Sequence, residues 1–563
     1  MTKKVSQFEY KRADISAAAA AIKAAVEKVK SAKSGAELKA IRDGIQKLFA
    51  DVSTAYCISE IRYTLNVKDE FYLAEKDYYD ENMPNVSAAG VEFNKALLSS
   101  PYIDELKTLI NPLIIDKARD GVRVMDERII PERVEENKLV TEYDNLMASL
   151  TFEWRGERLT LAQMQKYTKD PDRSVRKAAF TVIGKTLESV SDKLDTYMDK
   201  LVAVRTRMAQ KMGFADYSQM GDMAIGHFGY GRKEIAVFRE SVLREVVPMI
   251  TRLKGRLCEK LGIDKVHIYD NDNYIVGGNI DPEGTSEQLF AAAQSMYDDM
   301  KPELGAFFKQ MCDAEAIDYR ARENKLGGGY AEIIQNYGQP FIFANFNGTM
   351  DDVGVLTHEF GHAYAFKRAY DNDIDLDLGV GGMETAETHS MGMEALCNKY
   401  NGKLYGGREK EATYQQIFDA VNFLPYGVIV DYFQELIYKN YGMTPAERKA
   451  LWIKLESEFR PYVDMSDVPY INIGGRWQYQ KHIYEVPFYY IDYCLSTCLA
   501  LQFGELAAVD YADALNRYLG LVEAGGTKTI DVLAQEAGLK SPFDGSALKE
   551  LCAAVEKHIE DLQ

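Results

Sequence analysis

Residues 341–366 read FIFANFNGTMDDVGVLTHEFGHAYAF. This stretch predicts two elements, and the fold class follows from them together with the segments before and after. The first six residues are rich in aromatic and β-branched side chains, which is typical of a strand. After the turn signal Asn347-Gly348, apolar residues recur at helical spacing. Residues 349–352 (TMDD) look like a capping box, which predicts that a helix begins there. The stretch therefore predicts a strand that leads into a helix at about residues 350–370.

Helical periodicity dominates the rest of the chain. Residues 13–100 predict long helices with Ala-, Lys- and Glu-rich faces, and residues 170–320 predict a helical stretch with breaks. Residues 150–161 (LTFEWRGERLTL) alternate around a glycine and predict a hairpin. A second β-prone run, at residues 330–334, is separated from the first by turn residues. The sequence therefore predicts a mostly α fold with a small antiparallel sheet next to the helix at 350–370.

Composition limits the possible functions. The chain has 563 residues, a length typical of two or more lobes. Its 67 Lys and Arg residues against 86 Asp and Glu give a net charge of −19, which disfavours binding to nucleic acid or to an anionic membrane. No apolar run reaches the roughly 18 residues of a membrane span. Lys23 interrupts the Ala-rich run that begins at Ala17, which is typical of an amphipathic helix and not of a secretory signal. Seven scattered cysteines predict a reducing, cytoplasmic location.

The strongest chemical signal is the H-E-x-x-H motif at residues 358–362 (HEFGH). Composition predicts only about 0.01 chance occurrences of this pattern. His358 and His362 are four residues apart on the predicted helix, so both side chains point the same way and can reach one zinc ion. Glu359 is the residue type that serves as general base in such motifs. The alternative is a pair of core histidines with Glu359 in a salt bridge.

A catalytic zinc ion needs a third protein ligand and an open position for water. In the metzincin class, a glycine and a histidine follow the motif at the positions that Ala365 and Arg368 occupy here. That class is therefore excluded, and the third ligand has to come from elsewhere in the chain.

The segment GGMETAETHSMGME predicts a second helix, at about residues 383–400, after a glycine loop. Glu384, Glu387 and Glu394 fall roughly on one face of it. One of these carboxylates would complete the zinc site, and the others could orient the histidine N–H groups. His389 lies two residues after Glu387 and so points to a different face, which predicts a structural or orienting role.

These residues carry a resemblance to a known family. The HEFGH motif is followed, 25 residues after its last histidine, by Glu387 in an E-x-x-S frame that ends at Ser390. This arrangement resembles the thimet oligopeptidase and oligoendopeptidase F family of zinc metallopeptidases, which includes Pz-peptidase-like bacterial enzymes. GQPFIFANFNGT at 338–349 and HIYEVPFYYIDY at 482–493 extend the resemblance over about residues 325–500.

The resemblance implies which residues bind the metal and act as base. Glu387 is then the third ligand of one zinc ion per chain, and Glu384 is its neighbour. Glu384, Ser390 and Glu394 are expected to orient the ligands. Glu359 is expected to take a proton from the attacking water and to pass it to the leaving amine.

The resemblance also implies a neurolysin-like fold of the gluzincin type, in which two helical lobes flank a deep channel. We expect an N-terminal helical lobe at residues 1–160 and a catalytic domain at residues 161–563. Such a channel admits short peptides and excludes folded proteins. Oligopeptides are the expected partners, and no nucleic acid, membrane or obligate protein partner is expected.

In this family, a histidine and tyrosines in the C-terminal segment donate hydrogen bonds to the scissile carbonyl and to the substrate backbone. His482 and Tyr493 match that pattern best. The spacing differs by about one residue from the mammalian-type pattern, so Tyr489 and Tyr490 stay unranked as further donors. The alternative is an aromatic stripe that belongs to the core.

The strand before the zinc helix offers a possible substrate contact. Phe343, Ala344 and Asn345 are predicted to lie on a strand edge that pairs with an extended peptide through main-chain hydrogen bonds. The alternative is an ordinary strand packed beneath the helix.

We therefore expect a cytoplasmic zinc endopeptidase that cleaves internal bonds of short peptides. An aminopeptidase would share the zinc site but would need carboxylates that hold the substrate amine. GGMET at residues 381–385 resembles an aminopeptidase motif, yet it follows HEFGH instead of preceding it. A peptide-binding protein without activity would be expected to lack Glu359 or a ligand, and all of these are present.

Overall fold

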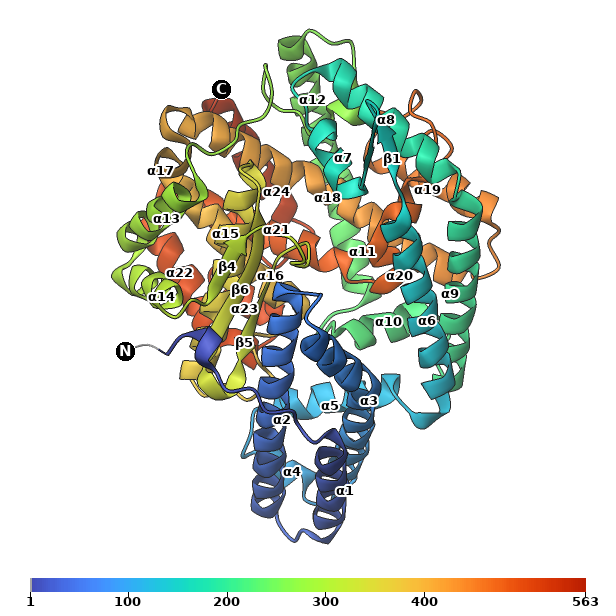
Figure 1. Ribbon diagram of the computed structural model, residues 1–563, viewed down its shortest axis with the longest axis vertical. Coiled ribbons are helices and arrows are strands. Elements are labelled where there is room, and N and C mark those ends of the chain that lie inside the picture. Colours follow the sequence, from blue (N-terminus) through green and yellow to red (C-terminus); the bar gives the residue numbers. More distant parts are fainter. Residues whose placement is uncertain (1–2) are drawn as a thin grey trace. The chain divides into compact units, whose positions relative to one another are not determined.

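Helices form most of residues 3–563, the part of the chain that the computed structural model describes (Figure 1). The chain divides into two units, each made of three segments. Unit 1 comprises Met1–Glu127, Asp281–Gly406 and Leu506–Gly538, and unit 2 comprises Arg128–Ile280, Gly407–Glu505 and Leu539–Gln563. Both units contain residues from either side of residue 160, so the division into lobes at 1–160 and 161–563 stays a prediction.

Unit 1 holds the N-terminal helices, a three-stranded sheet and the helix that carries HEFGH. Its helices are α1 (Ile15–Ser31), α2 (Gly35–Leu65), α3 (Glu70–Leu98), α4 (Ile103–Lys107), α5 (Pro112–Val124), α13 (Ser286–Met300), α14 (Pro302–Asp313), α15 (Met350–Asp371), α16 (Met383–Cys397), α17 (Asn401–Tyr405), α22 (Tyr511–Ala524) and α23 (Ile530–Glu536). Its strands are β4 (Ile317–Arg320), β5 (Tyr330–Ile334) and β6 (Gln339–Phe346).

The N-terminal helices begin where short polar side chains cap them. The Asp14 side chain accepts a hydrogen bond from the Ala17 N–H, and the Ser34 side chain accepts one from the Glu37 N–H, so α1 and α2 start directly after these caps. The helices α1, α2 and α3 lie side by side, in blue in Figure 1, and their buried apolar residues form one cluster. The long helices predicted for residues 13–100 are confirmed.

The sheet of unit 1 has the strand order β4-β6-β5. Strand β5 is antiparallel to β6, whereas β4 is parallel to it. The sheet predicted as antiparallel is therefore mixed. Strand β4 was not expected because its four residues lie inside the stretch predicted as helical and are too few to show a clear alternation. Helix α15 packs against β5 and β6 (Figure 1).

Helix α15 begins at Met350, as predicted, but not through a capping box. The Thr349 side chain makes no capping hydrogen bond. Instead the Asp352 carboxylate accepts hydrogen bonds from the N–H groups of Asn347 and Gly348, at 2.9 and 2.7 Å. Gly348 has a φ of +86°, a conformation that glycine adopts easily, and the turn it forms aims these N–H groups at the start of the helix.

Unit 2 consists of helices and short strands. Its helices are α6 (Ile130–Ser149), α7 (Leu161–Thr168), α8 (Arg173–Glu188), α9 (Ser191–Met212), α10 (Tyr217–Ile225), α11 (Arg232–Ser241), α12 (Val247–Leu261), α18 (Glu409–Lys439), α19 (Pro445–Phe459), α20 (Lys481–Glu485), α21 (Tyr490–Val509) and α24 (Ala547–Asp561); the last four residues of α21 are counted with unit 1. Its strands are β1 (Phe152–Trp154), β2 (Glu157–Leu159), β3 (Val266–His267) and β7 (Val463–Asp464).

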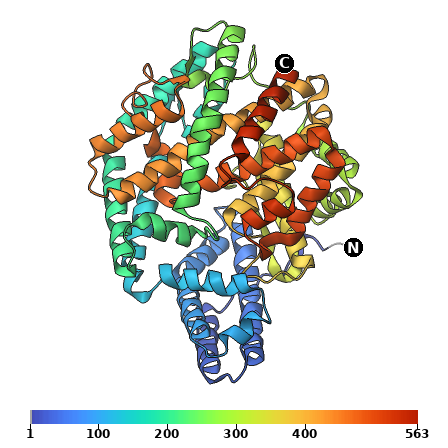
Figure 2. The same cartoon turned by 180° about the vertical axis from the view of Figure 1, so that it is seen from behind.

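Unit 2 contains the predicted hairpin and the C-terminal helix. Strands β1 and β2 pair antiparallel around Arg155-Gly156, which confirms the predicted hairpin. The C-terminal helix α24, red in Figure 2, packs beside α12 and α18.

No helix in the described part of the chain combines the length and the hydropathy that a membrane crossing needs.

Candidate active site

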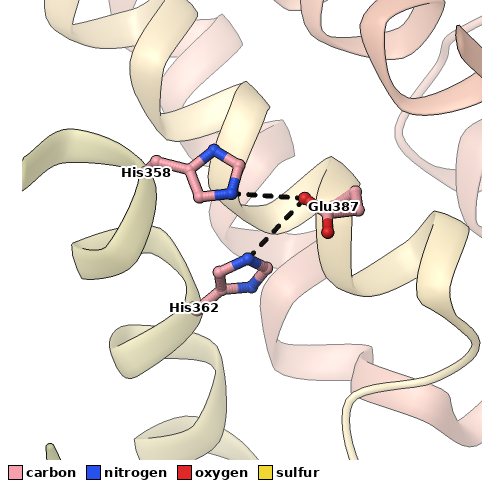
Figure 3. Close-up of side chains that lie close together, drawn as sticks. All are labelled: His358, His362 and Glu387. Atoms are coloured by element: carbon pink, nitrogen blue, oxygen red, sulfur yellow. Dashed lines mark ion pairs between the residues drawn. The ribbon is translucent and has the colours of Figure 1, made fainter. Parts of the chain in front are cut away.

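Helices α15 and α16 bring three predicted metal ligands together in unit 1. His358 and His362 lie one turn apart on α15, and Glu387 faces them from α16 (Figure 3). The Oε2 atom of Glu387 is 3.3 Å from Nε2 of His358 and 3.7 Å from Nε2 of His362. Within residues 3–563, these three form the one group of His, Cys, Asp or Glu side chains whose ligand atoms all lie within 4.8 Å of one another.

The spacing of these ligand atoms is compatible with a zinc ion. Two ligand atoms at about 2.0–2.1 Å from one zinc ion, at tetrahedral angles, lie about 3.4 Å apart. The distances from Oε2 of Glu387 to the two histidine Nε2 atoms, 3.3 and 3.7 Å, bracket that value. Two imidazoles and a carboxylate are also the donor set of many catalytic zinc sites, which leave the fourth position to water or substrate.

Two neighbouring side chains orient the candidate ligands. Nδ1 of His358 is 2.7 Å from Oε1 of Glu394, so this nitrogen donates its proton and leaves the lone pair of Nε2 directed at the metal position. The Ser390 hydroxyl lies 2.9 Å from the main-chain carbonyl oxygen of Glu387 and 3.2 Å from its Oε2, and its one proton is shared between these two acceptors. The sequence predicted this role for Glu384, Ser390 and Glu394. Glu394 and Ser390 lie beside the candidate ligands, and the role itself stays a prediction.

The two histidines differ in their electrostatic surroundings. Burial lowers the pKa of His358, but hydrogen bonds to Glu387 and Glu394 outweigh this effect and hold the pKa well above its usual value. A metal ion bound at Nε2 would take the place of the proton that this nitrogen shares with Glu387. Burial, together with the neighbouring His358, lowers the pKa of His362 to about 4. His362 is therefore a neutral imidazole, the form that binds a metal.

Glu384 lies outside the group of three. It is buried at the start of α16, where its carboxylate accepts a hydrogen bond from the Thr385 hydroxyl at 3.1 Å. A Cβ atom on Gly382 would come within 2.4 Å of the same carboxylate, so the side chain folds back over the helix start. This placement supports Glu387 rather than Glu384 as the third ligand.

Glu359 lies between the two histidines in sequence and is only 8% exposed. Its Oε2 atom has no hydrogen-bond partner among the described residues. Burial raises the pKa of Glu359 to about 7, helped by repulsion from Glu387 and opposed by His358. A carboxyl group with a pKa near neutrality can both accept a proton and return it, as a general base and then a general acid must.

The short distance between α15 and α16 depends on Gly361, which lies inside the HEFGH motif. A Cβ atom at this position would lie 2.7 Å from the carbonyl oxygen of His389 and 2.7 Å from Cα of Ser390. These are main-chain atoms, which cannot move aside without moving α16. Only glycine lets the helix that carries Glu387 come this close to the two histidines.

Gly361→Ala is therefore expected to destabilise the protein by about 1–3 kcal/mol, the usual cost of overpacking a core, and to lower its metal content. Thermal denaturation and metal analysis would measure both effects. Gly354→Ala is the matched control on the same helix, since its Cβ would meet nothing within 4 Å. A Gly361→Ala protein with normal Tm and full metal content would contradict the argument.

His389 is fully buried, and neither of its ring nitrogens has a hydrogen-bond partner among the described residues. Burial lowers its pKa to about 3, so the ring is neutral. Its main-chain carbonyl accepts a hydrogen bond from the Tyr518 hydroxyl at 2.6 Å. His389 is not part of the group of three candidate ligands, in agreement with its position two residues after Glu387.

The predicted histidine and tyrosines gather in unit 2. The centroid of the His482 ring, on α20, is 5.9 Å from that of Tyr489, 5.0 Å from that of Tyr490 and 6.2 Å from that of Tyr493. All four side chains are half-buried. We call these four residues the tyrosine cluster. Its geometry brings the candidates together without ranking Tyr489 against Tyr490.

Residues distant in sequence hold the start of α21. Nε2 of His227 lies 2.8 Å from Oδ1 of Asp492, which also accepts a hydrogen bond from the Tyr230 hydroxyl at 3.1 Å. Burial lowers the pKa of His227, but Asp492 and Asp222 on either side raise it to about 10. Sequence reasoning missed this buried ion pair because no local pattern connects a histidine after α10 with an aspartate on α21.

The proposed substrate edge at Phe343, Ala344 and Asn345 is wrong. Strand β6 is the central strand of its sheet, and Phe343 pairs with Asp318 on β4 and with Tyr330 on β5. The Lys325 ammonium group donates to the Ala344 carbonyl, and the Asn345 amide donates to the carbonyls of Leu326 and Gly328. The prediction failed because β4 was not recognised and β6 then appeared to have a free side.

Comparison with family models finds two matches. Residues 5–125 match the Peptidase M3 N-terminal domain, and residues 166–552 match Peptidase family M3.

Individual proteins and structures are also similar to this chain. Oligopeptidase PepF of Bacillus subtilis (strain 168) is 20% identical over 533 residues, which cover 91% of this chain and 73% of that protein. A structure described as PZ peptidase A with inhibitor 2 has a TM-score of 0.92 and 35% identity, over 99% of both chains. A chain provisionally named oligoendopeptidase F, from Bacillus anthracis str. Ames, has a TM-score of 0.86 and 31% identity, over 99% of this chain and 98% of its own.

Proposed function

The chain belongs to peptidase family M3, and from that premise we propose that it is a zinc-dependent oligoendopeptidase that hydrolyses internal bonds of short peptides, with Glu359 as general base. Family membership makes it a metallopeptidase that acts on peptides. The expected resemblance and the mostly α fold are confirmed. One observation carries the zinc and general-base parts of the proposal. The buried carboxylate of Glu359 lies on the same helix as His358 and His362, and Nε2 of both histidines lies near the carboxylate of Glu387.

Each residue of the site has a part in this proposal. A zinc ion held by His358, His362 and Glu387 would supply a Lewis acid that polarises the scissile carbonyl and makes water more acidic. Glu394 keeps His358 in the tautomer whose Nε2 can bind a metal. Glu359 accepts a proton from the attacking water and passes it to the leaving amine.

The proposal gives the tyrosine cluster the role of stabilising the negative charge that forms on the substrate. We assign to Tyr493 and His482 the hydrogen bonds to the oxygen that becomes negative as water attacks, with Tyr489 and Tyr490 as further candidates. Donors aimed at a developing charge lower the barrier more than they strengthen substrate binding. The support is the family match over residues 166–552 and the close packing of the four rings.

Tyr493→Phe removes one hydroxyl and little volume. We expect kcat to fall roughly 10²-fold or more, as for the loss of an oxyanion donor, while KM, Tm and metal content change little. Steady-state kinetics on one peptide would measure this. The same substitution at Tyr489 and at Tyr490 ranks the alternatives. A normal kcat in Tyr493→Phe, with the loss in another variant, would move the assignment to that residue.

Cleavage of an N-blocked, internally quenched short peptide tests the proposed function. We expect hydrolysis at an internal bond, loss of activity with a chelator and recovery with zinc, and one zinc ion per chain by metal analysis. Cleavage only of peptides with a free N-terminus would favour an aminopeptidase. Zinc binding without turnover of any peptide would favour a peptide-binding protein. Intact casein, expected to be a poor substrate, tests the preference for short peptides.

Two further expectations belong to this proposal. The scattered, odd-numbered cysteines support a cytoplasmic enzyme. The match of residues 5–125 to a separate N-terminal model supports an N-terminal helical lobe, here proposed as residues 1–160, ahead of a catalytic domain at 161–563.

A further inference from the structure

Gln480 lies between Tyr426 and His482 and contacts both. The Tyr426 hydroxyl donates to Oε1 of Gln480 at 2.8 Å. Nε2 of Gln480 lies 2.8 Å from Nδ1 of His482. Tyr426 lies on α18, Gln480 directly before α20, and His482 on α20. All three belong to unit 2, so this chain of hydrogen bonds lies within one unit.

The amide of Gln480 determines where the proton of His482 lies. An amide nitrogen has two hydrogens and only donates, so Nδ1 of His482 has to accept. A neutral imidazole carries one proton, which then resides on Nε2. Burial and the neighbouring Lys481 lower the pKa of His482 below its usual value, which keeps the ring neutral.

Tyr426 sets the orientation of this amide. Burial raises the pKa of Tyr426 to about 12, so the phenol keeps its proton. Oε1 of Gln480 is the only hydrogen-bond acceptor within reach of that hydroxyl among residues 3–563. With the amide reversed, the phenol proton would lose this acceptor. The Arg476 guanidinium lies 4.0 Å from the centroid of the Tyr426 ring and holds the ring in place by a cation–π contact.

The rings around His482 restrict its orientation as well. Tyr490 meets it edge to face, at 67° and 5.0 Å between centroids, and Tyr493 does so at 89° and 6.2 Å. With Nδ1 bound to Gln480, the free N–H of the imidazole is Nε2–H. A histidine held in this way is a neutral donor, the form suited to a carbonyl oxygen that gains negative charge.

We propose that Gln480 is a positioning residue, which holds His482 as the neutral Nε2–H tautomer so that this N–H donates to the peptide substrate. The inference rests on the proposed function, since it takes His482 to contact substrate. It goes beyond that function by naming the residues, Tyr426 and Gln480, that select the protonation state.

Gln480→Glu is the sharpest test, because a carboxylate accepts and an amide nitrogen donates. In this variant Nδ1 of His482 has to carry a proton, and at a pH above the pKa of the ring, where the imidazole is neutral and where the measurements are made, Nε2 becomes an acceptor. Gln480→Met has a similar size and removes the hydrogen bond without reversing it. The control is Gln288→Glu, which makes the same change of charge far from His482 in sequence. Gln288 is part of the capping box of α13, in which a glutamate can make the same hydrogen bond as a glutamine.

The first measurement is the tautomer itself. Nitrogen-15 NMR of the whole protein with labelled histidine, assigned by the signals that vanish in His482→Ala, reports which ring nitrogen is protonated. We expect protonated Nε2 in the wild type and in Gln288→Glu, and protonated Nδ1 in Gln480→Glu. Protonated Nδ1 in the wild type would overturn the inference.

The second measurement is turnover of the quenched peptide. We expect Gln480→Glu to lower kcat on the order of tenfold, the scale of one hydrogen bond, with KM less affected. In the His482→Ala background the same change should have little further effect, since the two residues act as one unit. Wild-type kcat in Gln480→Glu, with the tautomer reversed, would also overturn the inference. The spectra can be recorded whether or not the protein cleaves peptides. An inactive wild type would contradict the proposed function, and protonated Nδ1 in the wild type would contradict the inference, so the two failures are distinguishable.

Discussion

Glu359→Gln is expected to remove nearly all peptide turnover while the protein keeps its metal and its Tm. Glutamine matches glutamate in size and can hydrogen-bond, but it cannot take a proton from water. General-base assistance contributes typically about 10²–10⁴-fold, and kcat should fall by at least that order. The kcat of the purified variant on the quenched peptide, together with its metal content, measures both parts.

The control for Glu359→Gln is Asp351→Asn, which removes one exposed carboxylate near the start of the same helix. It should leave kcat close to that of the wild type. A Glu359→Gln enzyme with near-normal kcat and a bound metal ion would show that another group accepts the proton, and the proposed mechanism would then be wrong.

Glu387→Ala is expected to lose both metal and activity. Its Oε2 is the oxygen that lies 3.3 and 3.7 Å from the two histidine Nε2 atoms, and no other carboxylate joins their group in the described part of the chain. Glu384→Ala should keep the metal and cost less activity, because that carboxylate folds over Gly382. Metal stoichiometry after dialysis against a weak chelator, measured for both variants, compares the two directly.

The outcome that would reverse this assignment is full metal in Glu387→Ala and none in Glu384→Ala. Equal loss in both variants would point to damage at the start of α16 instead. Circular dichroism of each variant distinguishes that case, because a damaged helix start lowers Tm and a lost ligand in a folded protein leaves the helices in place.

Much of the fold and of the candidate metal centre follows from local patterns in the sequence. The helix at about 350–370 and the strand before it are confirmed as α15 and β6, since helical periodicity and β-prone runs act over a few residues. The shared direction of His358 and His362 needs only the helical repeat. The selection of Glu387 needed the spacing known from the family, because a helix face alone left three glutamates equivalent.

The features that sequence reasoning missed all depend on contacts between distant segments. Strand β4 exists because it pairs with β6, and its four residues carry no decisive pattern of their own. The need for Gly361 comes from the backbone of α16, which passes 2.7 Å from where a Cβ would lie. The tautomer of His482 comes from Gln480 and, through it, from Tyr426 on another helix. A hydrogen bond or a close approach between segments far apart in the chain leaves no periodic trace in either one, so only the folded chain shows it.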